Sequence, residues 1–157
     1  MRCKKIKIDK EESEHIYCPR PIRLLRWVND IEEIFKMERE VEVSEPWFKL
    51  IKEGRKTTEG RKNTEKWSGI NPGDVIIFTN NEGGERGTKR VRAQVVEIVH
   101  YLGSNALENY LRGESLECAL PGVKTYEEGK LVYLKFWNNE EIEKYGMLAI
   151  RIKLLQP

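Results

Sequence analysis

The sequence lacks long hydrophobic runs and paired cysteines. No segment approaches the roughly 20 consecutive apolar residues of a membrane-spanning helix, and the basic N-terminus is not followed by the apolar core of a signal peptide. The three cysteines, Cys3, Cys18 and Cys118, are too few and too scattered for a disulfide framework, and their odd number favours a reducing compartment. We therefore expect a soluble cytoplasmic or nuclear protein with no membrane contact.

An excess of one charge is also missing, because 28 Lys and Arg face 26 Asp and Glu, for a net charge of +2. So weak a bias does not predict nucleic-acid binding, and any such site must come from local clustering. Metal ligands are equally sparse: His15 and Cys18 are the one pair near zinc-like spacing, with Cys3 and Cys118 far from a second pair. We expect no metal and no other cofactor.

What the sequence does contain is one domain's length, 157 residues, with enough apolar residues for a core. Apolar residues recur at helical spacing from Leu24 to Phe35, which predicts an amphipathic helix over residues 22–37. This helix belongs to an N-terminal extension, residues 1–37. The main domain is expected over residues 38–157.

Short strands and short helices interleave in the main domain. Apolar patterns predict strands over residues 41–43, 75–78, 90–101 and 148–154. The apolar positions change parity after Val95, which indicates a bulge or a bend in the third strand. Because there is no βαβ rhythm, the pattern predicts an α+β fold built on a small barrel.

Local signals place the helices and turns. Ser44 is expected to cap a helix that has Pro46 in its first turn and ends at Gly54 in a left-handed conformation. Ser104 is expected to cap a short helix through Leu111. Residues 71–74, Asn-Pro-Gly-Asp, are typical of a type II turn.

One segment has two interpretations. Thr125 and Glu128 form a capping-box pattern and predict a helix running toward Trp137. Residues 131–134 are continuously apolar, however, and could equally form a buried strand. If the helix forms, Tyr126, Tyr133 and Trp137 share one of its faces, either as core residues or as the lining of a cleft.

The most unusual stretch is Gly-Arg-Lys-Thr-Thr-Glu-Gly-Arg, residues 54–61. It resembles the ASCH family signature, Gly-x-Lys-x-x-Glu-x-Arg, with Gly54, Lys56, Glu59 and Arg61 at the four specified positions. Landmarks of that family flank it in order, from Pro-Trp at residues 46–47 to Tyr-Gly-Met-Leu-Ala-Ile at residues 145–150. The resemblance covers roughly residues 40–155 and leaves residues 1–37 outside.

The resemblance implies a PUA-like β-barrel with short helices packed at its rim, and a cleft into which the signature residues point. It also favours the helix over residues 125–138. Members of the family are generally linked to RNA. They include some ribonucleases and a branch of small amidohydrolases that act on acetylated cytidine.

The signature residues suit a nucleotide-sized ligand. Glu59 and Arg61 are two apart on an extended segment, so both side chains emerge on one face. A guanidinium can bind a phosphate or a base edge, a carboxylate can accept from an exocyclic amine, and Lys56 offers a mobile charge for phosphate. Alternatively, Glu59 and Arg61 form a structural pair that seals the barrel end, with Lys56 solvated.

Neighbouring residues extend this candidate RNA site. Arg55, Lys62 and Lys66 with Trp67 combine positive charge with an aromatic ring, as single-strand binding sites do. Trp67 could equally be a core anchor. A second basic cluster at residues 89–92 (Lys89, Arg90 and Arg92) either extends the RNA surface or protects an exposed edge strand.

The sequence thus predicts a protein that binds single-stranded RNA or a nucleotide. One alternative is a hydrolase in which Lys56 stabilises an oxyanion, Glu59 is the general base and His100 assists. In the amidohydrolase branch a Thr nucleophile stands three residues after the motif Lys; here that position is Glu59, and Thr57 and Thr58 lie at other offsets. A second alternative is an adaptor that binds a protein partner through the helix over residues 22–37.

Overall fold

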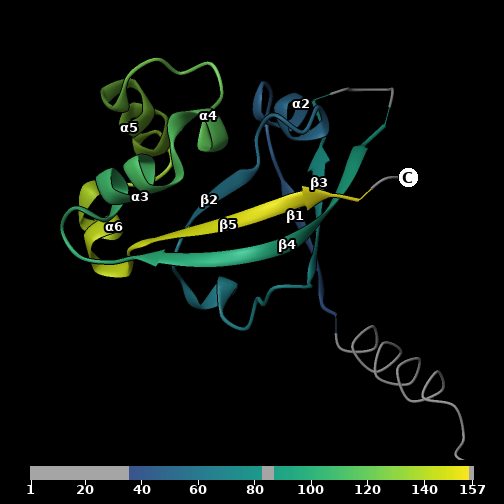
Figure 1. The fold of residues 1–157 in the computed structure, drawn as a ribbon, viewed down its shortest axis with the longest axis horizontal. Coiled ribbons are helices and arrows are strands. Elements are labelled where there is room, and N and C mark those ends of the chain that lie inside the picture. Colours follow the sequence, from purple (N-terminus) through teal and green to yellow (C-terminus); the bar gives the residue numbers. More distant parts are fainter. Residues whose placement is uncertain (1–35, 83–86, 156–157) are drawn as a thin grey trace, which may run out of the picture. The chain divides into compact units, whose positions relative to one another are not determined.

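Five strands form one mixed sheet in the part of the chain that the computed structural model describes, residues 36–82 and 87–155 (Figure 1). The strands are β1 (Glu38–Glu42), β2 (Thr58–Lys62), β3 (Val75–Asn80), β4 (Lys89–Tyr101) and β5 (Met147–Leu154). The helices are α2 (Trp47–Lys52), the 3₁₀ turn η1 (Glu65–Trp67), α3 (Ala106–Glu114), α4 (Leu116–Ala119), α5 (Tyr126–Leu134) and α6 (Asn139–Tyr145).

The sheet has the order β1-β3-β4-β5-β2, in which β1 runs parallel to β3 and the other neighbours are antiparallel. Strands β1 and β2 are its two edges, so the expected small barrel takes the form of a half-barrel. The predicted bulge is confirmed, because the β4–β5 register shifts between Val95 and Glu97. With short helices beside it, the sheet makes a small α+β, PUA-like fold.

Two groups of buried residues hold the fold together. One joins α2 to the sheet and contains Phe48, Ile51 and Phe78, each at most 2% exposed. The other packs α3 to α6 around one end of β5, where Tyr110 and Met147 are fully buried (Figure 1). Strand β2 pairs with β5 and also contacts α4, so its residues lie beside the helical group.

The predicted strands are all present, but two predicted helix caps are wrong. Helix α2 begins at Trp47 without a side-chain cap from Ser44, and the Glu45 carboxylate accepts from the Lys49 N–H at 3.1 Å instead. Helix α3 begins at Ala106 after Asn105, so Ser104 does not cap it. The type II turn is confirmed, because Gly73 has φ +100° and the Asp74 N–H donates to the Asn71 carbonyl.

The segment after residue 125 is helical, so the strand interpretation of residues 131–134 is wrong. The Thr125 hydroxyl accepts from the Glu128 N–H at 3.2 Å and begins α5. This helix ends at Leu134, and a capping box between Asn138 and Glu141 begins α6, which the sequence analysis did not predict.

The predicted helix over residues 22–37 lies, except for its last two residues, outside the described residues. None of the helices in the described ranges is long and apolar enough to cross a membrane.

Candidate functional site

The residues of the Gly54–Arg61 signature converge beside edge strand β2. Gly54 follows α2 with φ +72°, as predicted, and turns the chain so that the Lys56 N–H donates to the Leu50 carbonyl at 3.0 Å. Glu59 and Arg61 then lie on β2, opposite Ile150 and Leu148 of β5. The helix end and the strand pairing together fix the positions of the three charged side chains.

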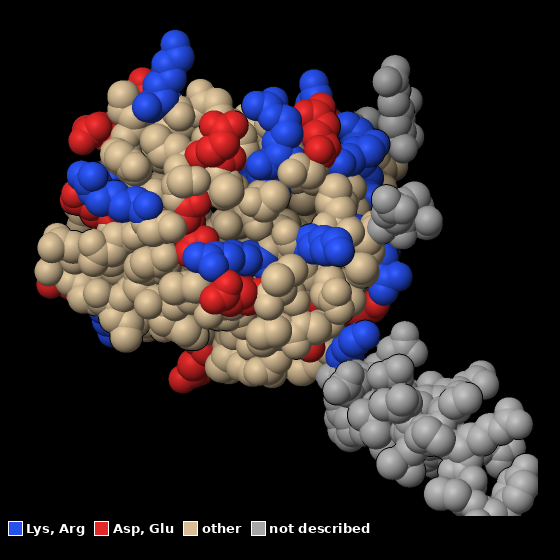
Figure 2. Space-filling model, viewed as in Figure 1, with Lys and Arg blue, Asp and Glu red and all other residues tan. Residues whose placement is uncertain are grey.

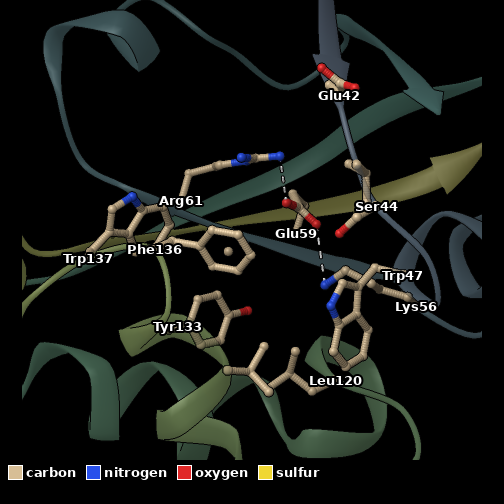
Figure 3. A pocket seen from close by; sticks show the side chains of 13 residues that line it. Glu42, Ser44, Trp47, Lys56, Glu59, Arg61, Leu120, Tyr133, Phe136 and Trp137 are labelled. Atoms are coloured by element: carbon tan, nitrogen blue, oxygen red, sulfur yellow. Dashed lines mark ion pairs between the residues drawn. The ribbon is translucent and has the colours of Figure 1, made fainter. Parts of the chain in front are cut away.

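Glu59 lies between the two cations of the signature (Figure 3). One carboxylate oxygen is 3.3 Å from the Lys56 Nζ, and the other is 2.9 Å from an Arg61 Nη. The Glu59 side chain is 9% exposed and that of Lys56 only 3%. The interpretation of Glu59 and Arg61 as an ion pair therefore describes one part of this arrangement.

Lys56 is a fixed, buried charge, where the sequence predicted a mobile one. Its ammonium also donates to the carbonyl oxygens of Thr58, at 2.7 Å, and Ala119. These two bonds and the Glu59 contact use all three ammonium protons. Burial lowers the pKa of Lys56, and the Glu59 carboxylate opposes this. Lys56 thus holds Glu59 in place and has no proton free for a ligand.

Arg61 has donors to spare. Its side chain is 23% exposed, and its guanidinium lies over the Trp67 ring at 5.6 Å from the ring centroid. Among the described residues its side chain contacts one acceptor, Glu59, and its Nε is buried without a hydrogen-bond partner. Since an arginine carries five N–H donors, several remain for a ligand.

The three charged groups line a hollow of about 170 Å³, which we call the central hollow (Figure 3). Glu42 and Ser44 also line it, and most of its remaining wall is aromatic or apolar: Trp47, Leu120, Val132, Tyr133, Phe136 and Trp137. A cavity of about 150 Å³ accommodates benzene, so this volume suits one planar ring. Space is thus present beside the ion pairs, and they do not seal it.

The aromatic wall of the central hollow consists of Trp47, Tyr133, Phe136 and Trp137. Of these, the sequence analysis named only Tyr133 and Trp137 as a possible lining of a cleft. Tyr133 and Trp137 stack, with ring centroids 6.0 Å apart and an interplanar angle of 19°. Phe136 is 64% exposed although it lines the hollow. An exposed phenylalanine at the edge of a hollow offers a ring face for stacking. Phe136 and Trp47 were not predicted as site residues; Trp47 packs against both groups of buried residues.

The residue between Glu59 and Arg61 is Gly60, and two tyrosine side chains leave no room for a larger residue there. A Cβ atom there would lie 2.5 Å from the hydroxyl oxygens of both Tyr110 and Tyr133. Those two hydroxyls are 2.8 Å apart and hydrogen-bonded to each other. Burial raises the pKa of both tyrosines. The two rings thus support the backbone of β2 directly beneath the charged residues.

The remaining predicted binding residues lie around the central hollow. Arg55 and Lys66 are exposed, and each lines an adjoining hollow. Lys62 pairs with Glu141 at 2.7 Å. Trp67 is only 7% exposed and belongs to the core, so it is the core anchor and not an open stacking platform.

The basic cluster at residues 89–92 is neutralised by carboxylates. Arg90 pairs with Glu40, and Arg92 with Glu38, across the sheet. Strand β4 lies in the middle of the sheet, but its residues 89–92 pair with β3 alone, because the pairing with β5 begins at Ala93. Protection of an exposed strand edge by these residues therefore stays a prediction. Figure 2 shows the same mixing more widely, since Lys and Arg side chains alternate with Asp and Glu over the face in view.

Of the groups named for hydrolysis, Lys56 and Glu59 line the central hollow and the others do not. His100 is exposed on β4 and does not line it. Thr57 and Thr58 line a different hollow, where the Thr58 hydroxyl donates to Glu114 at 3.3 Å. Ser44 and Tyr133 supply hydroxyl groups among the described lining residues of the central hollow. Cys3, His15 and Cys18 lie outside the described residues, within which no cluster of three metal-binding side chains occurs.

Comparison with known proteins identifies relatives that match most of this chain. A sequence model of the ASCH domain matches residues 41–156. The crystal structure of hypothetical protein PH0355 is 39% identical, covers 76% of this chain and 100% of its own, and superposes with a TM-score of 0.64. The solution structure of protein PF0455 from Pyrococcus furiosus is 41% identical, covers 77% and 100%, and gives a TM-score of 0.60. No curated protein matches the chain.

Proposed function

The chain belongs to the ASCH domain family, whose members are generally thought to bind RNA, and from that premise we propose that it binds single-stranded RNA by taking one unpaired base into the central hollow. The observation that carries the proposal is the fixed position of Glu59 at an aromatic-lined space of ring size.

Glu59 and Arg61 match the edge of a nucleobase. The Glu59 carboxylate is held by cations on both oxygens, and each oxygen keeps a lone pair that can accept from an exocyclic amine. Arg61 has N–H donors for a ring nitrogen or carbonyl beside that amine. A base with an adjacent donor and acceptor on its Watson–Crick edge would satisfy both residues, and that edge is available only when the base is unpaired.

The aromatic wall would hold the base by its face. Trp47 and Phe136 both line the hollow, and the stacked pair of Tyr133 and Trp137 adds a rigid surface. Stacking on an aromatic side chain contributes about 1–3 kcal/mol per base. In the proposed complex, stacking supplies much of the affinity, and the two charged residues supply the choice of base.

The experiment is a binding titration by fluorescence anisotropy. The ligands are four labelled single-stranded RNA oligonucleotides that differ only in the base at the central position. Arg61→Ala and Glu59→Gln are each expected to weaken binding about tenfold or more, because each removes a charged hydrogen bond of about 1.5–3 kcal/mol. Lys153→Ala, an exposed lysine on β5 outside the hollow, is the control and should bind like wild type. Wild-type affinity in both site variants, with folding verified by circular dichroism, would rule out the central hollow.

The hydrolase and adaptor hypotheses have separate tests. Hydrolysis through Lys56 would require its ammonium to release one of three existing contacts. The test is incubation with RNA and with acetylated cytidine, where no product above a Lys56→Ala control leaves that hypothesis unsupported. An adaptor that uses residues 22–37 should lose its protein partner, and keep RNA, when residues 1–37 are deleted.

A further inference from the structure

We infer that the bound base belongs to the interior of an RNA strand, whose backbone continues on both sides of the central hollow. This inference rests on the proposed function and goes further, because it distinguishes a continuous strand from a free nucleotide or a strand end. The observations that carry it are two further hollows that adjoin the central one, and the charges that line them.

The two flanking hollows share lining residues with the central hollow. The first, the Trp47 hollow, measures about 360 Å³, lies between α2 and residues 121–123, and shares Trp47. The second, the Trp137 hollow, measures about 300 Å³ and shares Glu42, Arg61 and Trp137. Shared walls mean that a chain can pass from one hollow to the next across one side chain.

The flanking hollows lie on opposite sides of the central one. In Figure 3, Trp47 and Lys56 stand at one end of the site, and Arg61 and Trp137 stand at the other, with Glu59 between them. A ligand that filled the central hollow and left it in both directions would therefore enter the Trp47 hollow at one end and the Trp137 hollow at the other. A single nucleotide can use at most one of these exits.

Each flanking hollow has one more cation than carboxylates. Lys49 and Arg55 face Glu53 in the Trp47 hollow. Arg61, Lys62 and Lys66 face Glu40 and Glu42 in the Trp137 hollow.

The surplus positive charge is available on both sides. Within residues 36–82 and 87–155, Arg55 and Lys66 form no ion pair, whereas Lys49 pairs with Glu53 at 3.8 Å and Lys62 with Glu141. Free cations on both shoulders of a base-sized hollow suit a backbone with one phosphate before the base and one after it.

The test compares short oligoribonucleotides of about nine nucleotides with the corresponding nucleoside monophosphates, in titrations with the full chain. Arg55→Ala and Lys66→Ala are each expected to weaken oligonucleotide binding about threefold to fivefold. Each should also lower the slope of log K against log salt by about 0.7, the contribution of one phosphate on a single strand. At most one of them should change the affinity for the monophosphate, because a single nucleotide reaches at most one flanking hollow. Lys153→Ala controls for a general loss of positive charge.

The outcomes separate this inference from the proposed function. Oligonucleotide affinity above that of the monophosphate, lowered by both variants, supports a continuous strand. Equal affinity of the two ligands, or an effect of only one variant on the oligonucleotide, overturns it. In that case Arg61→Ala would still weaken binding if a base or a strand end occupies the central hollow. Absence of binding by both ligands overturns the inference together with the proposed function.

Discussion

Replacing Lys56 by methionine tests the central feature of the site, the buried ammonium that holds Glu59. The substitution keeps an unbranched side chain that is one heavy atom shorter, and it removes three hydrogen-bond donors. It leaves the carbonyls of Thr58 and Ala119 without that partner, and it leaves Glu59 with Arg61 alone. The perturbation is thus specific for the charge and its contacts.

The expected loss of stability follows from these contacts. Removing one partner of a buried ion pair costs about 3–5 kcal/mol, because the remaining charge stays buried. Two unsatisfied carbonyls increase the loss, at about 1–3 kcal/mol for each buried group, and deleting the desolvated ammonium offsets part of it. We expect a net loss of about 3–5 kcal/mol in the free energy of unfolding, or a fall in Tm of about 10 °C or more.

The assay is urea unfolding followed by circular dichroism, with Lys49→Met as the matched control. Lys49 also forms an ion pair, with Glu53, but its side chain is 71% exposed, so its replacement should change stability by no more than about 0.5 kcal/mol. A loss below about 1 kcal/mol for Lys56→Met would refute the reasoning. It would mean that Lys56 is the mobile charge that the sequence alone predicted.

Three other substitutions test the surroundings of the site. Gly60→Ala should destabilise the fold by about 1–3 kcal/mol, since its Cβ would lie 2.5 Å from two tyrosine hydroxyls; a wild-type melting curve would contradict that packing. Burial raises the pKa of Glu114, but hydrogen bonds from Arg151 and Tyr101 lower it by more than burial raises it. The pKa of Glu114 therefore lies below its usual value of 4.5. The ionised form therefore stabilises the fold above pH 4.5, and this contribution is lost as the pH falls through the lowered pKa. Glu114→Gln should flatten that acid dependence in thermal melts, and an unchanged dependence would exclude this ion pair as its source. Phe136→Ala should leave stability within about 0.5 kcal/mol and weaken RNA binding about tenfold, whereas a large loss of stability with normal binding would reverse its assigned role.

The strands were predictable because their signals are local. The change of apolar parity after Val95 required a bulge or a bend, and the register shift lies there. The helix at residues 139–145 was equally local, since Asn138 and Glu141 carry the spacing of a capping box. That signal was overlooked. At Ser44 a local capping signal was present but gave a wrong prediction. The neighbouring Glu45 competes for the same helix end, and its carboxylate accepts from the Lys49 N–H.

The site was predictable in its members but not in their roles. The signature places Glu59 and Arg61 on one face of a strand, and the strand pairing agrees. The burial of Lys56 depends on the Ala119 carbonyl, which lies 63 positions further along the chain. Packing at such a distance has no periodicity to detect. For the same reason Trp67 could not be assigned to the core, nor Phe136 to the edge of the hollow, before the fold was known.

The charge distribution bears on how selective the proposed binding must be. The net charge is +2, and the basic cluster at residues 89–92 is paired with carboxylates. Non-specific RNA binding depends on unpaired positive charge along a surface, and Figure 2 shows acidic side chains among the basic ones. Little affinity can therefore come from the backbone alone. A base that does not satisfy Glu59 would leave a buried carboxylate facing an acceptor, so discrimination between bases would exceed what phosphate contacts provide.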